Sequence, residues 1–457
     1  MQRPVTNTDL ERLLATASCT NGGFGRAVNA ALNGATCYDR SSVYHWLRGR
    51  TPDAAVLTAM ATVLSRRLGR RVGEHELGFS ADAPALDLAL VFAPGLPDGI
   101  DAAGQLWRYC LNHHDPQAGL ARRDVLGSIA YLAGAAPAAA FAWHFTPDDH
   151  IPDHGPATGA VTPLDVEDLR QARMQFLGID RRQGGGSARQ WVGDYLGQHV
   201  APLLRRPVPA AVARDLYGAA AQLTEQCGYM HYDAASHGIA QRLFIQALRL
   251  AKAAGDRVLS AHVMSNLSVQ AVYLGRGAEA VQLARAARTA AGTTPPPALL
   301  ARLNDTEARG HALLLDERES RAALARAADH LTRADPTQGP DWLTAYTPAH
   351  HAGTAMHVLR DLGHPTEAAR HARAALPTGT GGVRSNALHR ILHASVLLRM
   401  KETDQACVVA ADVVGSSGAV ESDRLRTRIG QFRAEAAAHE PTTATRDFLE
   451  LTRPMPR

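Results

Sequence analysis

An internal repeat is the feature of this sequence that most restricts how the chain can fold. LGRGAEAVQLARAA (274–287) and LGHPTEAARHARAA (362–375) align without a gap, and SRAALARAA (320–328) repeats their ending between them. TDQACVVAAD (403–412) continues the series at a spacing of 38 residues. Repeats of about 40 residues are typical of helix pairs that stack, because one pair cannot bury its apolar face alone. The repeat therefore predicts an all-α chain, with an α-solenoid that presents a concave surface.

Small residues occupy the repeat positions at which neighbouring helices would touch. Ala280, Ala284 and Ala287 allow one helix to lie close against the next, and Gly275 can close the turn between two helices. Further helix ends are predicted at Gly255, Gly292, Gly363 and the TPPPA segment 294–298. A tetratricopeptide unit has two small residues, an aromatic residue and a third small residue at fixed spacing. Gly228, Ala240, Phe244 and Ala247 have this spacing.

The chain divides by composition into three predicted regions. We expect a small helical domain over residues 1–80, a Pro- and Gly-rich linker with one or two helices over 81–162, and the helical repeats over 163–457. In the linker, RRDVLGSIAYLAGAAPAAAFAWHF (122–145) has paired arginines before about twenty mostly apolar residues, as in a membrane span. Its Ala, Gly and Pro content favours a buried or interfacial helix instead, and we do not expect a membrane partner.

The excess positive charge of the chain lies in its first eighty residues. They hold ten arginines against six acidic residues, a balance of +4, whereas the other residues hold 38 basic and 38 acidic side chains. Chance explains four charges as well as a nucleic-acid partner does. Five scattered cysteines without metal spacing, and an opening segment without an apolar core, favour a reducing cytoplasm.

Four helices are predicted in residues 1–80. The first begins at Thr8, with Glu11 completing a capping box, and the second contains FGRAVNAAL (24–32). The third, RSSVYHWLRG (40–49), is capped by Asp39 and ended by Gly49. Thr51 and Pro52 open the fourth.

The third helix has two different faces. Val43, Trp46 and Leu47 would pack inward, whereas Ser41, Tyr44, His45 and Arg48 share the opposite face. In a DNA major groove such a face could contact base edges. Arg50 and the N-terminus of the helix could then bind the phosphates of the DNA backbone. The simpler alternative is a polar face that only meets water. The predicted DNA-binding set is Arg40, Ser41, Ser42, Tyr44, His45, Arg48 and Arg50.

A family resemblance favours the DNA-binding alternative. SSVYHWLRGRTPD (41–53) resembles the recognition-helix region of Xre-type, lambda-repressor-like helix-turn-helix proteins. The chain also resembles actinomycete regulators that join such a domain to C-terminal tetratricopeptide repeats, and three further segments carry this likeness: LSRRLGRRVGEHELGF (64–79), IDRRQGGGSAR (179–189) and YDAASHGIAQRLFIQALRLAKAAGD (232–256). The resemblance implies control of differentiation or secondary metabolism, often by repression. The sequence departs from the family at NGATCYD (33–39), which is longer than a standard turn.

No catalytic or metal-binding constellation stands out. QGGGSAR (183–189) lacks the Gly-Lys-Ser/Thr ending of a phosphate loop, so we predict a flexible turn between helices. His113–His114 and His350–His351 are adjacent pairs that diverge on a helix and lack a third ligand. We therefore expect neither an enzyme nor a cofactor nor a bound metal.

The concave surface is the second predicted site. Asn and Gln amides there could pair with the backbone of an extended peptide, although each could also serve only to satisfy neighbouring helices. The candidate residues, on the first helices of successive units, are Asn266, Gln270, Asn304, Glu307, His350, Asn386 and His389. Together with the resemblance, they predict a homodimeric regulator of double-stranded DNA whose solenoid binds a signalling peptide, small molecule or protein. The alternative is a scaffold that docks another regulator without binding DNA.

Overall fold

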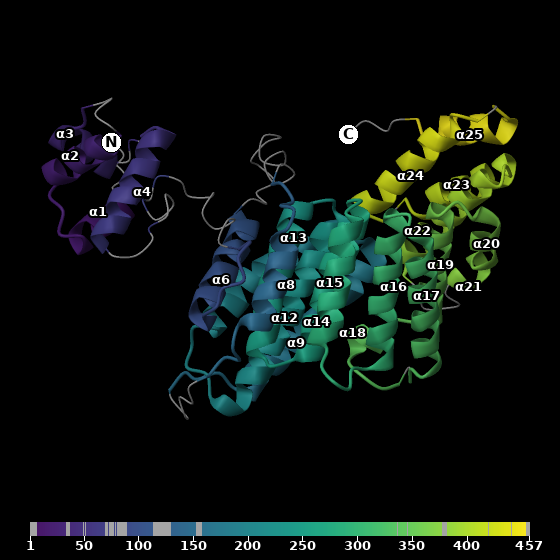
Figure 1. The fold of residues 1–457 in the computed structure, drawn as a ribbon, viewed down its shortest axis with the longest axis horizontal. Helices are drawn as coiled ribbons and strands as arrows, with labels where there is room; N and C mark the ends of the chain where they lie inside the picture. The colour runs from purple at the N-terminus through teal and green to yellow at the C-terminus, as the bar shows by residue number, and fades with distance from the viewer. Residues whose placement is uncertain are drawn as a thin grey trace. The chain divides into compact units, whose positions relative to one another are not determined.

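The computed structural model describes residues 7–32, 37–48, 50, 52–68, 72, 77, 79, 89–112, 129–151, 158–335, 337–344, 346–376, 382–418, 420–439 and 441–453. Within these residues the regular secondary structure is helical and contains no strand, which confirms the all-α prediction (Figure 1). The chain forms two compact units, Met1–Leu88 and Ala89–Arg457.

In the part of the first unit that the structure describes, four helices surround one apolar core. The helices are α1 (Thr8–Thr16), α2 (Asn21–Ala31), α3 (Arg40–Leu47) and α4 (Ala54–Leu68). Their fully buried side chains include Leu10, Phe24, Val28, Val43, Met60 and Leu64. The apolar periodicity of the sequence predicts this core, because each of these residues lies on the inward face of its helix.

Helix α1 begins at Thr8 as predicted, but its predicted cap and the predicted start of α4 are wrong. The side chain of Asn7, not Thr8, accepts the capping hydrogen bond from the Leu10 backbone, so Thr8 is already helical. Tertiary contacts fix Asn7 in this role, because its amide also donates to the carbonyl of Leu77 at 2.7 Å. Helix α4 begins at Ala54, two residues after Pro52. Gly49 and Thr51, the other predicted boundary residues, lie outside the described residues.

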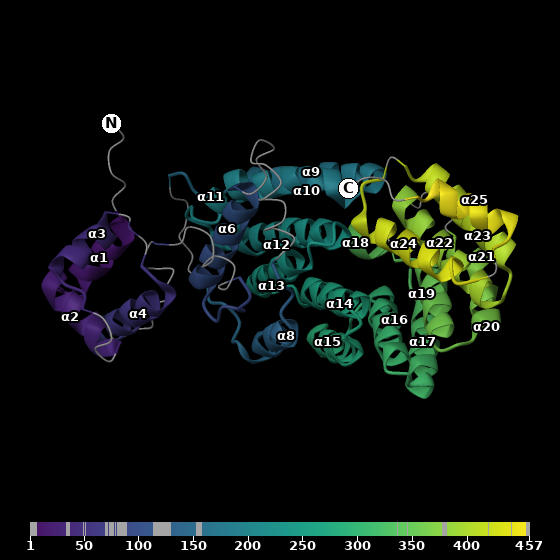
Figure 2. The same cartoon turned by 90° about the horizontal axis from the view of Figure 1, so that it is seen from above.

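The second unit is a series of helices that pack mainly against their sequence neighbours (Figure 2). They are α6 (Leu96–Asn112), α8 (Ala135–Phe145), α9 (Pro163–Gln183), α10 (Gly185–Tyr195), a π-helical turn (Leu196–Val200), α11 (Ala201–Leu203), α12 (Ala210–Asp233), α13 (His237–Ala253), α14 (Arg257–Tyr273), α15 (Gly277–Ala290), α16 (Pro297–Leu313), α17 (Glu317–Thr332), α18 (Asp341–Thr344), α19 (Pro348–Asp361), α20 (Pro365–Arg370), α21 (Ala372–Ala375), α22 (Val383–Arg399), α23 (Thr403–Ser416), α24 (Asp423–Ala436) and α25 (Thr443–Leu451).

The repeated segments lie in the second helix of successive pairs, namely α15, α17, α20 with α21, and α23. Ala280, Ala284 and Ala287 are fully buried, as predicted for helices in close contact. The predicted helix ends also hold, since the backbone is left-handed after the helices at Gly255 (φ 67°), Gly275 (φ 73°), Gly292 (φ 90°) and Gly363 (φ 86°).

The unit around Gly228 shows why small residues are needed. A Cβ atom at Gly228 would lie 2.9 Å from ring carbons of Phe244, so α12 and α13 touch at this glycine. Ala240 and Ala247 are fully buried in the same helix pair.

Two helices of the segment 81–162 belong to the second unit. Helix α6 packs on α10 and α13, and α8 packs on α13 and α15. The guanidinium of Arg249 in α13 donates two hydrogen bonds, of 2.8 and 2.6 Å, to Asp149 after α8. In α8, Ala136, Ala140 and Trp143 are buried, as expected for a helix that covers the repeats. None of the described helices has the length and apolar character needed to cross a bilayer.

The last helices of the second unit contact the first ones. Helix α22 packs against α9, and α24 packs against α12. Arg384 of α22 donates to Asp180 of α9 at 2.8 and 2.7 Å and to Asp233 of α12 at 3.0 Å. Ser422, the cap of α24, donates to the same Asp233 at 2.9 Å. These buried groups join segments more than 150 residues apart and close the curved array of helices around an internal cavity.

The QGGGSAR segment lies at this closure, where its backbone packs closely against other segments. Gly184 (φ 89°) ends α9, and α10 begins at Gly185. A Cβ atom at Gly184 would lie 2.6 Å from the carbonyl oxygen of Glu421, and one at Gly185 would lie 2.8 Å from that of Met230. The predicted turn between helices is confirmed, and its glycines allow the close backbone approach at this point.

Candidate functional site

The exposed face of α3 is the first candidate site. Asp39 accepts a hydrogen bond of 2.9 Å from the Ser42 backbone, and the Ser42 hydroxyl also donates to Asp39. These hydrogen bonds lower the pKa of Asp39, and the bond from the Ser42 backbone has the largest effect. The predicted cap is therefore confirmed. The half-buried Ser42, which is one of the predicted DNA-binding residues, uses its hydroxyl in the cap.

The other predicted DNA-binding residues are exposed to solvent. Tyr44 keeps 46% of its surface accessible, and the Arg48 guanidinium lies over its ring at 5.2 Å. His45 meets the same ring edge-on at 5.9 Å. Val43 and Trp46 on the opposite side are buried. The structure also leaves Arg40, Ser41 and Arg50 exposed. One short helix thus combines a fixed apolar side with an accessible side of hydrogen-bond donors and a stacked arginine.

The connection between α2 and α3 spans eight residues, from Leu32 to Asp39. Asn29 of α2 holds the end of this connection, because its amide donates to the Tyr38 carbonyl at 2.8 Å and its side-chain oxygen accepts from the Tyr38 backbone at 2.7 Å. Gly25 allows the contact, since a Cβ atom there would lie 2.9 Å from the same carbonyl. Sequence reasoning missed Asn29, because a polar residue on a helix gives no local sign of its distant partner.

The second candidate site is a cavity of about 670 Å³ in the second unit. Residues of eight helices line it, namely α9, α12, α14, α16, α18, α19, α22 and α24. Among the described residues, nine arginines and four carboxylates line the cavity, an excess of five positive charges before its histidines are considered. The cavity also contains four tyrosines and Trp342.

The predicted groove residues separate into two sets. Asn266, His350 and His389 line the cavity, whereas Gln270, Asn304 and Asn386 are not among its lining residues. The side-chain amide of Gln270 donates to the His237 carbonyl at 2.8 Å, so it bonds to the backbone of α13 and not to a ligand. His350 and His389 are largely buried, and burial, as the main cause, lowers the pKa of both, to about 4 for His350.

Asn266 belongs to a polar group at one end of the cavity. Its amide donates to Glu225 at 2.6 Å, and its side-chain oxygen accepts from Arg302 at 2.6 Å. His262 lies 3.6 Å from Glu225 and contacts Trp342 with tilted rings, whose centroids are 4.3 Å apart. Burial alone would raise the pKa of Glu225, but its hydrogen bond to His262 and the nearby arginine charges hold that pKa below its usual value.

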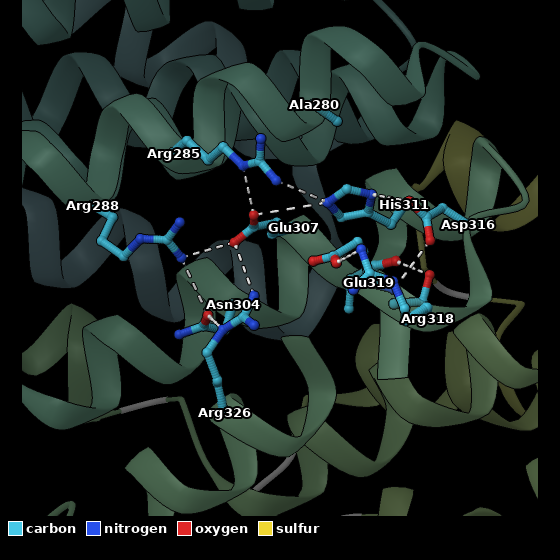
Figure 3. Close-up of polar contacts among 12 residues, drawn as sticks. Ala280, Arg285, Arg288, Asn304, Glu307, His311, Asp316, Arg318, Glu319 and Arg326 are labelled. Atoms are coloured by element: carbon cyan, nitrogen blue, oxygen red, sulfur yellow. Dashed lines mark hydrogen bonds and ion pairs between the residues drawn. The ribbon is translucent and has the colours of Figure 1, made fainter. Parts of the chain in front are cut away.

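Asn304 and Glu307 face a different side of α16, where they join α15 to α17 (Figure 3). Arg285 and Arg288 each donate to Glu307 at 2.8 Å, and Arg326 donates to Asn304 at 2.9 Å. Burial acts to raise the pKa of Glu307, but the hydrogen bonds from Arg288 and Arg285 outweigh it, so the pKa lies below its usual value. Asn304 and Glu307 are therefore bonded to the neighbouring helices α15 and α17, so they link the repeats and do not face the cavity.

The opposite end of the cavity is basic. Arg309, Arg360 and Arg428 come from α16, α19 and α24, and His357 lies one turn before Arg360. His357 is partly buried, and its pKa is lowered first by burial and then by the charges of Arg309 and Arg360. Guanidinium groups gathered in this way can bind phosphate or carboxylate groups.

The histidine pairs do not form a metal site in the described part of the chain. His351 contacts Asp305 at 2.9 Å, whereas His350 stacks on Tyr346, so the two neighbours face different partners. The described residues contain no cluster of three or more possible metal ligands. His113 and His114 lie outside the described residues.

Comparison with known proteins concerns the first unit alone. The family model described as the SP15 N-terminal domain matches residues 10–80, which include most of α1, all of α2 to α4 and the exposed face of α3. No curated protein matches the sequence.

Proposed function

We propose that this chain is a sequence-specific DNA-binding transcriptional regulator, in which the first unit contacts double-stranded DNA and the second binds an effector. The first unit is proposed to be a helix-turn-helix domain of the Xre type, and the second a tetratricopeptide-like α-solenoid. The resemblance of the sequence to actinomycete regulators further suggests a cytoplasmic homodimer that represses genes of differentiation or secondary metabolism.

The observation that carries this proposal is the division of α3 into two faces. Val43 and Trp46 anchor the helix in the apolar core, while Tyr44, His45 and Arg48 stay accessible on the other side. In a major groove, Arg48 could donate to guanine O6 and N7, and Arg40 and Arg50 could contact phosphates. The local charge balance of +4 would favour association with the DNA backbone.

The test is a selection of fragments from random and genomic DNA with the full chain at two salt concentrations. A recovered inverted repeat, bound well above random DNA in both conditions, would support a dimeric sequence-specific regulator. Arg48→Ala and Tyr44→Ala should each weaken binding to that site by about 1–3 kcal/mol if a good base contact is lost. Arg67→Ala, an equal loss of charge on α4, serves as the matched control.

A scaffold that docks another regulator is the second candidate function. The eight residues between α2 and α3 favour it, because a standard helix-turn-helix uses three or four. Recovery of sequence-blind binding alone, from a first unit shown to be folded, would support the scaffold and contradict the DNA-reading face.

A further inference from the structure

The basic end of the cavity carries more positive charge than its carboxylates balance. Arg360 pairs with Asp361 at 2.6 Å, and Arg428 donates to the neutral Gln431 at 2.9 Å. Among the described residues, the Arg309 side chain has no hydrogen-bond or ion-pair partner, and Tyr232 and Asp361 act on its charge only at longer range. Three guanidinium groups from three helices thus face two carboxylates, those of Asp361 and Asp305, and Asp305 already contacts His351.

This arrangement costs free energy in the absence of a ligand. Burial lowers the pKa of Arg309, and the charges of Arg428 and Arg360 lower it further. Arg309 is partly buried, and a partly buried cation without an ion-pair partner destabilises a fold, so replacing it with a neutral side chain should not destabilise the unit. The folding of the second unit therefore does not explain why an arginine stands at position 309, whereas an anionic ligand does.

Gln226 is a second and independent sign of a ligand. This residue of α12 is only 7% exposed and lines the same cavity. Neither its amide nitrogen nor its amide oxygen has a hydrogen-bond partner among the described residues. Buried amides are almost always satisfied, so this amide points to a polar group that is supplied from outside the chain.

We propose that the cavity binds a small organic phosphate, with its phosphate held by Arg309, Arg360 and Arg428 and its uncharged polar part bonded to Gln226. Guanidinium groups match phosphate oxygens in geometry and charge. The cavity volume of about 670 Å³ lies within the usual range for small-molecule sites. The inference rests on the effector role proposed above and gives that effector a chemical class, in place of an extended peptide.

The experiment measures ligand binding to the full chain by calorimetry, without DNA, so that it can fail separately from the DNA-binding proposal. The probes are inorganic pyrophosphate, ADP, citrate and a glutamate-rich peptide. Pyrophosphate and ADP should bind, and Arg309→Gln should weaken both by about tenfold or more, as expected when a charged hydrogen bond is lost. Gln226→Leu should weaken ADP more than pyrophosphate, because pyrophosphate has no uncharged polar part.

Two further measurements keep the result interpretable. Arg326→Gln removes one charge from the cluster of Figure 3, outside the cavity, and should leave binding unchanged. The ligand-free thermal midpoint of Arg309→Gln should not fall below that of the wild type. Absence of pyrophosphate and ADP binding, preference for citrate or the acidic peptide, equal loss in Arg326→Gln, or a lower midpoint for Arg309→Gln would each overturn the proposal.

Discussion

The two units differ in what they bury. Among the described residues, the core of the first unit is apolar, and Asn7 is its single buried polar side chain. The second unit buries glutamate, aspartate, arginine, histidine and amide groups between its helices, including Glu225, Asp233, Arg249 and Glu307. A small unit can define its structure by large side chains that fill one core. Stacked helices rich in alanine also need directional contacts, since alanines allow many registers and paired charges allow few.

The first prediction concerns the apolar unit. Trp46→Ala should destabilise the first unit by about 3–5 kcal/mol, because a largely buried ring is replaced by a cavity. For a unit of this size that loss approaches its whole stability. Hydrogen exchange of the full chain checks the prediction, since amides of residues 8–68 should lose protection while those of α12 to α17 keep theirs.

Tyr44→Ala is the matched control on the same helix, because Tyr44 is exposed. Its free energy of unfolding should stay within about 0.5 kcal/mol of the wild type. Equal loss of protection in both variants would show that the two faces of α3 do not differ as described.

The second prediction concerns the charged closure of the second unit. Arg384→Ala leaves the buried carboxylate of Asp180 without its cation and removes one of the two arginines paired with Asp233, so it should cost about 3 kcal/mol or more. Arg390→Ala, on the same helix, removes an exposed pair with Asp412 and should cost no more than about 1 kcal/mol. Urea unfolding of both variants gives the comparison, and similar midpoints would mean that closure does not stabilise the unit.

Local signals allowed much of the fold to be predicted from the sequence. The helices, the glycine ends at 255, 275, 292 and 363, and the inward face of α3 follow from periodicity and turn chemistry. The closure does not follow from them, because Asp180 and Arg384 are 204 residues apart and neither carries a local sign of its partner.

The cavity could be predicted only in part for a related reason. Helix α16 has two polar faces, with Arg302 and Arg309 toward the cavity and Asn304 and Glu307 toward α15 and α17. Neighbouring positions on a helix point about 100° apart, so placing a residue on the first helix of a repeat does not fix which face it occupies. The basic cluster formed by Arg309, Arg360 and Arg428 was missed because its members come from three different repeats.

The last prediction tests whether close contacts between helices restrict which side chains the second unit tolerates, as the apolar core does in the first unit. Gly228→Ala places a Cβ atom 2.9 Å from the Phe244 ring and should destabilise the second unit by about 1–3 kcal/mol, the usual cost of overpacking. Gly218→Ala on the same helix meets only Ala254, at 3.8 Å, and should stabilise the unit by up to about 1 kcal/mol through helix propensity. Urea unfolding should therefore give changes of opposite sign for one added methyl group in one helix. Equal signs would mean that α12 and α13 can move apart at Gly228, and that buried charge pairs, not alanine and glycine contacts, set the spacing of the helices.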